Sequence, residues 1–141
     1  PGGKKAVFLE MAGHTVLNPL LPKNDWNESV KIARQIYKEE EPDIVVGSSR
    51  GGAVAMAANL PTRKMILIAP AWKKYCPACT ISPNTTILHS PEDKVISFAD
   101  SGLLSKMFGA KLIMTGIDHY MNDETALKQL SHAVDNIFST T

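Results

Sequence analysis

The stretch Val45-Val46-Gly47-Ser48-Ser49-Arg50-Gly51-Gly52-Ala53-Val54-Ala55-Met56 places a Gly-x-Ser-x-Gly motif between a β-branched apolar run and a run of small residues. The first run predicts a buried strand and the second a helix, so Ser49 would lie at a tight turn between them. Such a turn holds its serine on strained backbone, and the flanking Gly47 and Gly51 would avoid collisions with the neighbouring elements. We therefore expect the Ser49 hydroxyl to project from the sheet edge into solvent.

The spacing of the glycines separates this turn from two common phosphate-binding loops. A P-loop needs Gly-x-x-x-x-Gly-Lys-Ser/Thr and a dinucleotide fingerprint needs Gly-x-Gly-x-x-Gly, and the segment from Gly47 to Gly52 has neither. The motif fixes only three residues, however, and a glycine-rich turn before a helix also serves as a structural or anion-binding turn. A serine nucleophile is the favoured interpretation, and the anion-binding turn stays open.

A helix that opens at Arg50 adds an electrostatic feature to the turn. Its first backbone amides have no partner within the helix, and they point toward Ser49 together with the positive end of the helix dipole. The backbone amide of Arg50 is therefore the predicted donor to an oxyanion formed beside the serine. The Arg50 guanidinium fits two roles equally well, contact with a substrate carboxylate or with an acidic residue on a neighbouring loop.

Bulk properties limit the classes of partner. At 141 residues the chain has the length of one domain, which we expect to span residues 1–141. Its 15 basic and 14 acidic residues are dispersed and give a net charge of +1, which argues against nucleic acid or an anionic membrane as a partner. No apolar run approaches the roughly 20 residues of a membrane span, and the first residues lack the apolar stretch of a secretion signal. A cytoplasmic protein with a small-molecule substrate is expected.

The N-terminal third predicts two helices and a strand. Residues 4–12 have the pattern of a short helix, and residues 15–18 have the composition of a strand. Asp25 and Glu28 have the spacing of an acidic capping box at the start of a second helix. Pro42 forbids that helix to continue.

The rest of the chain alternates strands with helices. The predicted strands are 44–46, 64–69, 85–89 and 110–114, and the predicted helices are 51–59, 97–108 and 123–138. Strands that are apolar throughout are buried on both faces, as in a parallel sheet. The predicted fold class is therefore α/β, a single-domain, doubly wound parallel sheet of about five strands with helices on both faces. Residues 72–80 show no convincing periodicity and would form an irregular excursion that overhangs the site.

Three loops follow the predicted strands with residues suited to catalysis. Ser49 follows strand 44–46, Asp93 follows strand 85–89, and His119 follows strand 110–114. Functional residues of a parallel sheet lie in the loops beyond the carboxyl ends of its strands. We therefore expect Ser49, Asp93 and His119 to meet at one edge of the sheet.

The chemistry of these side chains assigns them different roles. A serine is a poor nucleophile by itself, and a histidine that takes its proton during attack and returns it to the leaving group activates it. We assign the nucleophile to Ser49, the base to His119 and the orienting carboxylate to Asp93. Glu92 and Asp118 are rival acids in the same loops. Asp93 is favoured, because Glu92 is expected on the opposite side of its turn and Asp118 would point away from the adjacent His119.

With these residues the chain resembles a small bacterial α/β-hydrolase of the serine hydrolase superfamily. The resemblance rests on Ile44-Val45-Val46-Gly47-Ser48-Ser49-Arg50-Gly51-Gly52, Leu88-His89-Ser90-Pro91-Glu92-Asp93-Lys94-Val95-Ile96 and Gly116-Ile117-Asp118-His119. It implies a minimal α/β-hydrolase fold with a nucleophile elbow and a catalytic triad in the order Ser, Asp, His. Such hydrolases begin with a strand and a His-Gly loop that supplies the second oxyanion amide, whereas this sequence starts at the following helix. The resemblance thus implies impaired catalysis, and an unpaired sheet edge that favours a homo-oligomer.

Other residues that suggest chemistry are discounted. Cys76-Pro77-Ala78-Cys79 has the spacing of a redox pair or of half a zinc site, but the sequence has no second cysteine pair. Loop cysteines in a reducing cytoplasm are favoured, and a thiol redox protein is the weakest hypothesis. His14, His89 and His132 lack the spacing of a metal site, so we expect neither a metal nor a cofactor.

The sequence therefore predicts a carboxylesterase-like serine hydrolase that cleaves a small ester, thioester or amide through an acyl-serine intermediate. The alternative is a non-catalytic α/β binding module that holds an anion at the turn from Gly47 to Gly52. Trp72, Tyr75 and Tyr120 would line an acyl pocket, although packing is the simpler role for aromatic residues in loops. The acyl and leaving groups stay open.

Overall fold

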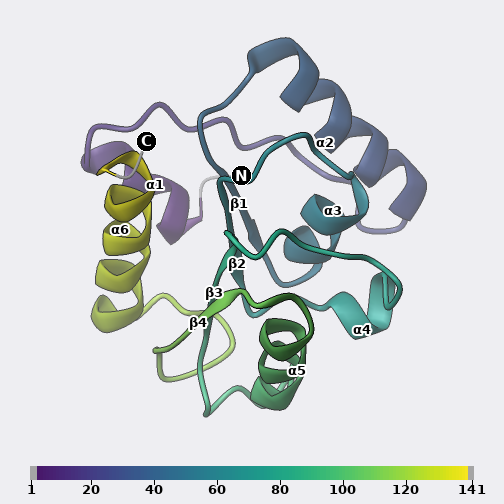
Figure 1. The fold of residues 1–141 in the computed structure, drawn as a ribbon. Helices are drawn as coiled ribbons and strands as arrows, with labels where there is room; N and C mark the ends of the chain where they lie inside the picture. The colour runs from purple at the N-terminus through teal and green to yellow at the C-terminus, as the bar shows by residue number, and fades with distance from the viewer. Residues whose placement is uncertain (1–2, 140–141) are drawn as a thin grey trace.

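The computed structural model describes residues 3–139 (Figure 1). Its elements are α1 (Lys4–Met11), α2 (Trp26–Glu40), β1 (Val45–Ser48), α3 (Arg50–Ala57), β2 (Met65–Ile68), α4 (Trp72–Tyr75), β3 (Thr86–His89), α5 (Phe98–Phe108), β4 (Lys111–Met114) and α6 (Glu124–Ser139). The predicted alternation of strands and helices from β1 onward is confirmed, with ends that differ by a residue or two. The excursion predicted for residues 72–80 is irregular except for the single turn of α4.

The four strands form one parallel sheet in the order β1-β2-β3-β4, so each strand pairs with its neighbour in the sequence. Successive right-handed crossovers in one direction put their helices on one face of a sheet. Accordingly α3, α4 and α5 cover one face, and α1 and α6 cover the other (Figure 1). The fold is therefore the predicted α/β class, and all four strands end at the same edge of the sheet.

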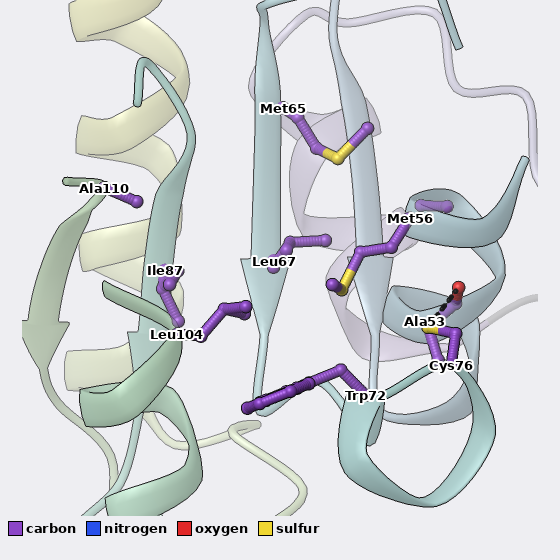
Figure 2. Close-up of a cluster of buried hydrophobic side chains, with 10 residues drawn as sticks. Ala53, Met56, Met65, Leu67, Trp72, Cys76, Ile87, Leu104 and Ala110 are labelled. Atoms are coloured by element: carbon purple, nitrogen blue, oxygen red, sulfur yellow. Dashed lines mark hydrogen bonds between the residues drawn. The ribbon is translucent and has the colours of Figure 1, made fainter. Parts of the chain in front are cut away.

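Two hydrophobic cores, one on each face, hold the layers together. The core beneath α3, α4 and α5 (Figure 2) consists of Ala53, Ala55, Met56, Met65, Leu67, Trp72, Cys76, Ile87, Leu104 and Ala110. The opposite core consists of Leu9, Ile66, Ile68, Leu88, Met121, Ala126, Leu130, Ala133 and Val134. Residues of β2 alternate between the two cores because successive side chains of a strand point to opposite faces. This central strand is thus buried on both sides, as its apolar sequence predicts.

The strand predicted for residues 15–18 is wrong. This segment has no regular secondary structure, and within residues 3–139 the sheet ends at β1. Val16 packs against the core that α6 covers, and Leu17 is exposed. A β-branched composition favours extended backbone, but a strand also needs a hydrogen-bonded neighbour, and the chain passes from α1 to α2 without pairing with β1.

The starts of α2 and α5 are capped by side chains, and the cap of α2 is the predicted one. The Asp25 carboxylate accepts a hydrogen bond from the Glu28 amide at 3.0 Å, so the start of α2 is confirmed. At the start of α5, the Ser97 hydroxyl accepts from the Ala99 amide in the same way.

No helix in residues 3–139 is both long enough and apolar enough to cross a membrane.

Candidate active site

Ser49 lies at the turn between β1 and α3 with φ 55° and ψ −119°, a conformation that few non-glycine residues adopt. Hydrogen bonds to nearby backbone groups of the same chain hold Ser49 in this conformation. The Ser49 amide donates to the Ile68 carbonyl at 2.8 Å, and the Ser49 carbonyl accepts from the amides of Gly52 and Ala71, each at 3.0 Å. The strained serine is thus held by β2 and by the segment that follows it.

Glycine is needed at two positions beside this turn, and one of them, Gly47, was expected. A Cβ at Gly47 would lie 2.7 Å from the Gly51 carbonyl oxygen, which confirms the requirement at that position. A Cβ at Gly51 would meet nothing within 4 Å, so the steric role predicted for Gly51 is wrong. Gly52 is the second constrained position, because its Cβ would lie 3.0 Å from Pro70 Cβ. The helix therefore approaches the chain after β2 closely through Gly52, while Gly51 faces open space.

Asp93 is held in the loop between β3 and α5. One carboxylate oxygen, Oδ1, accepts hydrogen bonds from the backbone amides of Val95 and Ile96, both at 2.8 Å. In the same loop, the Ser90 hydroxyl donates to the Gly116 carbonyl at 2.9 Å. The bond between Ser90 and Gly116 joins the loop of Asp93 to the loop of His119. The other carboxylate oxygen of Asp93, Oδ2, is thereby left facing the centre of the site.

The loop of His119, between β4 and α6, is held at both ends. Asp118 Oδ1 accepts from the amides of Tyr120 at 3.0 Å and Met121 at 3.1 Å. Met121 has φ 56° and is only 2% exposed, so its side chain anchors the loop in the core. From α1, the Lys5 ammonium donates to the Tyr120 carbonyl at 2.5 Å. These contacts fix the backbone on both sides of His119.

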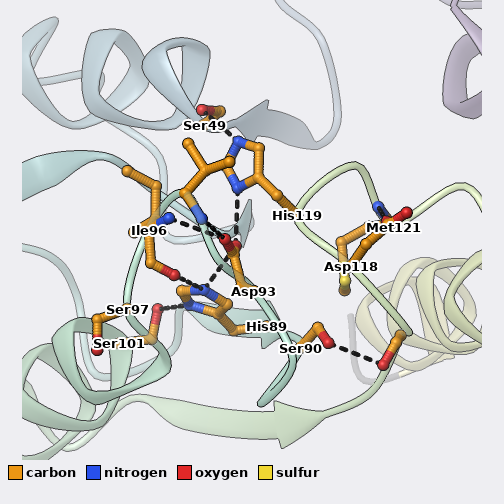
Figure 3. Close-up of polar contacts among 12 residues, drawn as sticks. Ser49, His89, Ser90, Asp93, Ile96, Ser97, Ser101, Asp118, His119 and Met121 are labelled. Atoms are coloured by element: carbon orange, nitrogen blue, oxygen red, sulfur yellow. Dashed lines mark hydrogen bonds and ion pairs between the residues drawn. The ribbon is translucent and has the colours of Figure 1, made fainter.

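Ser49, His119 and Asp93, the three predicted site residues, lie in hydrogen-bond contact (Figure 3). His119 Nε2 is 3.0 Å from Ser49 Oγ, and His119 Nδ1 is 2.7 Å from Asp93 Oδ2. A carboxylate only accepts hydrogen bonds, so Nδ1 carries the hydrogen of the neutral ring and Nε2 is free to accept the Ser49 hydroxyl proton. This tautomer is the one that a general base needs.

The Asp93 side chain is 0% exposed. Burial by itself raises the pKa of this carboxyl, but hydrogen bonds from the Ile96 amide, His119 and the Val95 amide outweigh it, and the net pKa is lowered. The carboxylate is therefore ionised at neutral pH. It can stabilise the positive charge that His119 would acquire on taking a proton.

The rival acids occupy other positions. Glu92 is exposed, and the Asp118 carboxylate caps its own loop. Within residues 3–139, the acid that His119 contacts is Asp93. The geometry therefore favours Asp93 as the orienting group.

His89, which the sequence analysis discounts, belongs to this network. It is the last residue of β3, its side chain is 0% exposed, and its Nε2 lies 3.0 Å from Asp93 Oδ2 (Figure 3). Its Nδ1 lies 2.6 Å from the hydroxyl of Ser101 in α5. The available signal was a single polar residue at the end of an apolar strand, four residues before Asp93. The spacing of metal ligands gives no information about a histidine that pairs with a carboxylate.

In residues 3–139 the Arg50 guanidinium forms no ion pair with an acidic residue, so that expectation is wrong. It donates to the Pro22 carbonyl and to the Ser29 hydroxyl, each at 3.1 Å, and it lies 5.6 Å from the ring of Trp26 and 5.8 Å from that of Tyr75. These contacts join the turn at Ser49 to α2 and its preceding loop. The side chain therefore has a packing role, and only the backbone amide of Arg50 lies at the helix start beside Ser49.

Of the three aromatic residues considered for an acyl pocket, Trp72 and Tyr75 pack elsewhere. Trp72 is buried in the core and donates from Nε1 to the Asp100 carbonyl at 3.0 Å, and Tyr75 stacks on Trp26. Tyr120 is 63% exposed, and its ring centroid is 5.6 Å from that of His119. Tyr120 is thus the aromatic residue beside the catalytic candidates.

Cys76 and Cys79 are free thiols. Cys76 is buried and lies 3.5 Å from the Ala53 carbonyl, to which its thiol donates. Burial, and then the neighbouring Cys79, raise the pKa of the Cys76 thiol to about 12, opposite to the shift that activates a redox cysteine. The described part of the chain holds no group of three or more His, Cys, Asp or Glu residues placed to bind a metal ion.

Solved structures of other proteins share the fold of this chain. No protein-family model matches the chain, and no curated protein matches it. The chain is similar to the crystal structure of a protein assigned to the alpha/beta hydrolase superfamily from Xanthomonas campestris pv. campestris, with a TM-score of 0.77 and 22% identity over 98% of this chain and 88% of that one. It is also similar to alpha/beta hydrolase domain-containing protein 10 from mouse (TM-score 0.70, 15% identity, 99% and 85% of the chains). A third similar structure is an alpha/beta serine hydrolase without a lid from Xanthomonas campestris (TM-score 0.65, 15% identity, 97% and 71% of the chains).

Proposed function

The chain has the α/β-hydrolase fold, and on that premise we propose that it is a serine hydrolase that cleaves a small ester, thioester or amide. The observation that carries the proposal is the continuous contact from Ser49 Oγ through His119 to Asp93, at 3.0 Å and 2.7 Å. A nucleophile, a base and an orienting carboxylate in this order are the minimum machinery of acyl transfer.

The proposed reaction forms and then breaks an acyl-serine. His119 Nε2 takes the hydroxyl proton as Ser49 Oγ bonds to the substrate carbonyl carbon, and the carbonyl oxygen becomes an oxyanion. The protonated His119 then gives its proton to the leaving group as the bond to that group breaks. A water molecule, activated by the same histidine, releases the acid and restores Ser49. Asp93 stays ionised throughout and stabilises the imidazolium.

The start of α3 supplies electrostatic support for the oxyanion. Arg50 is the first residue of this eight-residue helix, so its amide has no partner within the helix and points along the helix dipole. We assign the oxyanion contact to this backbone amide. One such donor contributes on the order of 3 kcal/mol to transition-state stabilisation.

We propose that the substrate carries a short acyl group. A cavity of about 310 Å³ lies at the opposite sheet edge, where Thr85 precedes β3, and one of about 250 Å³ lies on α2. Neither cavity is lined by Ser49, Asp93 or His119. The apolar side chains of Val95, Ile117 and Tyr120 in the adjacent loops are exposed by 62%, 69% and 63%. Exposed side chains of this kind would contact an acetyl or similarly short group but would not enclose a long chain.

A fluorophosphonate probe tests the proposal, because it reacts covalently only with an activated serine. We expect an adduct at Ser49 by mass spectrometry, loss of the adduct in Ser49→Ala, and labelling slower by on the order of 10⁶-fold in His119→Ala. The rate of 4-nitrophenyl acetate hydrolysis should fall in the same order, from wild type to His119→Ala to Ser49→Ala. The wild type should hydrolyse 4-nitrophenyl esters of longer acids more slowly than the acetate. A folded protein that neither labels nor hydrolyses these esters contradicts the proposal. In that case phosphate binding at the turn from Gly47 to Gly52 tests the non-catalytic alternative.

A further inference from the structure

The geometry points to His89 as a positioning residue that holds the Asp93 carboxylate in register with His119. This inference rests on the proposed function, since it adds a fourth member to the Ser49, His119 and Asp93 group. His89 has no contact with Ser49 in the structure and would act only through the carboxylate. Its role would be to keep one carboxylate oxygen, Asp93 Oδ2, directed at His119 Nδ1.

The hydrogen-bond partners of His89 determine its tautomer. Nε2 lies 3.0 Å from Asp93 Oδ2 and 3.0 Å from the Ile96 carbonyl oxygen, and both of these atoms can only accept. Nε2 must therefore carry a hydrogen, which it shares between the two acceptors. In the neutral ring Nδ1 is then an acceptor, so the Ser101 hydroxyl at 2.6 Å donates to it.

The ring is also fixed in place by its surroundings. The His89 and Ser101 side chains lie in the interior, each residue being 0% exposed, and the Phe98 ring meets the imidazole edge-on with centroids 5.6 Å apart. Ser101 and Phe98 belong to α5, so a helix on the face that α3 and α4 also cover orients a side chain at the end of β3. A buried donor that is locked in this way can hold a carboxylate without rearrangement during the reaction.

The four donors to Asp93 divide into two pairs. Oδ1 accepts from the amides of Val95 and Ile96, and Oδ2 accepts from His119 Nδ1 and His89 Nε2. The amides hold the carboxylate in its loop but do not contact the oxygen that His119 uses. His89 is therefore the group that fixes Oδ2 on the side away from His119 (Figure 3). Without it, that oxygen is buried with a single donor.

A pair of amide variants isolates the donor from the bulk of the ring. The side-chain nitrogen of glutamine reaches approximately the place of Nε2, whereas that of asparagine is one carbon shorter. We expect His89→Gln to keep the fluorophosphonate labelling rate within about threefold of wild type, and His89→Asn to lower it about tenfold to a hundredfold, the range for a lost hydrogen bond to a charged group. His132→Asn, at an exposed histidine of α6, is the matched control and should label as wild type does.

Nuclear magnetic resonance provides a readout that does not depend on catalysis. In the wild type, the ¹⁵N resonances of His89 should show a protonated Nε2 and an unprotonated Nδ1. The Nδ1–H proton of His119, which is bonded to Asp93, should shift in His89→Asn and keep its position in His89→Gln. Wild-type resonances of His119 in both variants, with equal labelling rates, would overturn the inference and leave the proposed function intact. If the wild type fails to label, the proposed function fails, and the His119 resonance still decides whether His89 positions Asp93.

A purely structural role predicts a different pattern. If His89 only fills space, Gln and Asn should lower the melting temperature by similar amounts, and the labelling rates of the folded variants should match each other. That result would also overturn the inference. If His89→Asn does not fold, Ser101→Ala provides the second test. It removes the donor to His89 Nδ1, and an unchanged protonated Nε2 together with an unmoved His119 resonance would contradict the proposed network.

Discussion

The Oγ atom of Ser49 lies 3.0 Å from Nε2 of His119, although 70 residues separate them in the chain. Ser49 is placed by the turn from β1 to α3, and His119 by a loop that Asp118, Met121 and Lys5 hold. The contact therefore depends on two independently fixed backbones that meet at one sheet edge. This separation makes the role of each part testable by single substitutions.

Asp93→Asn should abolish most activity without unfolding the protein. The substitution keeps an acceptor for the amides of Val95 and Ile96, but its NH₂ group would face His119 and His89 and favour the wrong tautomer of His119. We expect the labelling rate to fall by on the order of 10⁴-fold. Circular dichroism checks the fold, and Glu92→Gln, at the adjacent exposed acid, is the control that should stay near wild type. A loss of less than tenfold in Asp93→Asn would remove Asp93 from the proposed mechanism.

The lowered pKa of Asp93 should make stability depend on pH. Because the folded carboxyl has a pKa below the value of about 3.9 for an unfolded aspartate, the unfolded chain binds more protons in this range and stability rises with pH. The stabilisation is complete above the unfolded value and is lost as pH falls through the folded value. Urea unfolding from pH 7 to pH 2 should therefore show the difference in unfolding free energy between wild type and Asp93→Asn shrinking below about pH 5. A constant difference would show that Asp93 carries no such linkage.

Gly47→Ala should destabilise the turn that holds Ser49. The added Cβ would lie 2.7 Å from the Gly51 carbonyl oxygen and 2.8 Å from Gly52 Cα, both of them backbone atoms that cannot move aside easily. A loss of about 1 to 3 kcal/mol of unfolding free energy is expected from overpacking. Gly51→Ala is the matched control. Its Cβ meets nothing within 4 Å, and alanine in a helix is favoured over glycine by up to about 1 kcal/mol, so this variant should be as stable as wild type or more stable. Equal destabilisation by both variants would contradict this geometry.

Arg50→Met should change stability and leave substrate charge preference unchanged. The guanidinium contacts the Pro22 carbonyl, the Ser29 hydroxyl and two aromatic rings. Loss of these contacts should lower the unfolding free energy by about 1 to 3 kcal/mol, measured in urea. The ratio of kcat/KM values for a neutral ester and for an ester with a free carboxylate should stay constant, since the side chain is bonded to α2 and the loop before it. A selective loss of the charged ester would restore the substrate-contact hypothesis, and Arg63→Met is the exposed control.

Local sequence was sufficient for most of the secondary structure. The apolar run of β2, the carboxylate cap at Asp25 and the Gly-x-Ser-x-Gly turn around Ser49 all involve residues within a few positions of one another. The rule that functional residues follow the carboxyl ends of parallel strands then indicated which loops would meet. In this way the sequence predicts that Ser49, Asp93 and His119 meet at one edge of the sheet. Their catalytic roles stay a prediction until the labelling experiment is done.

Long-range contacts decided the remaining features, because pattern and propensity carry no information about distant partners. Residues 15–18 have the composition of a strand but meet no neighbour to pair with. Gly52 rather than Gly51 is the tight position because Pro70, from the connection between β2 and α4, lies against it. The Arg50 guanidinium finds α2 and its preceding loop, and His89 finds both Asp93 and Ser101, only once the sheet and its helices are assembled. A buried polar group takes whichever partners packing brings to it, and those partners exist only in the folded chain.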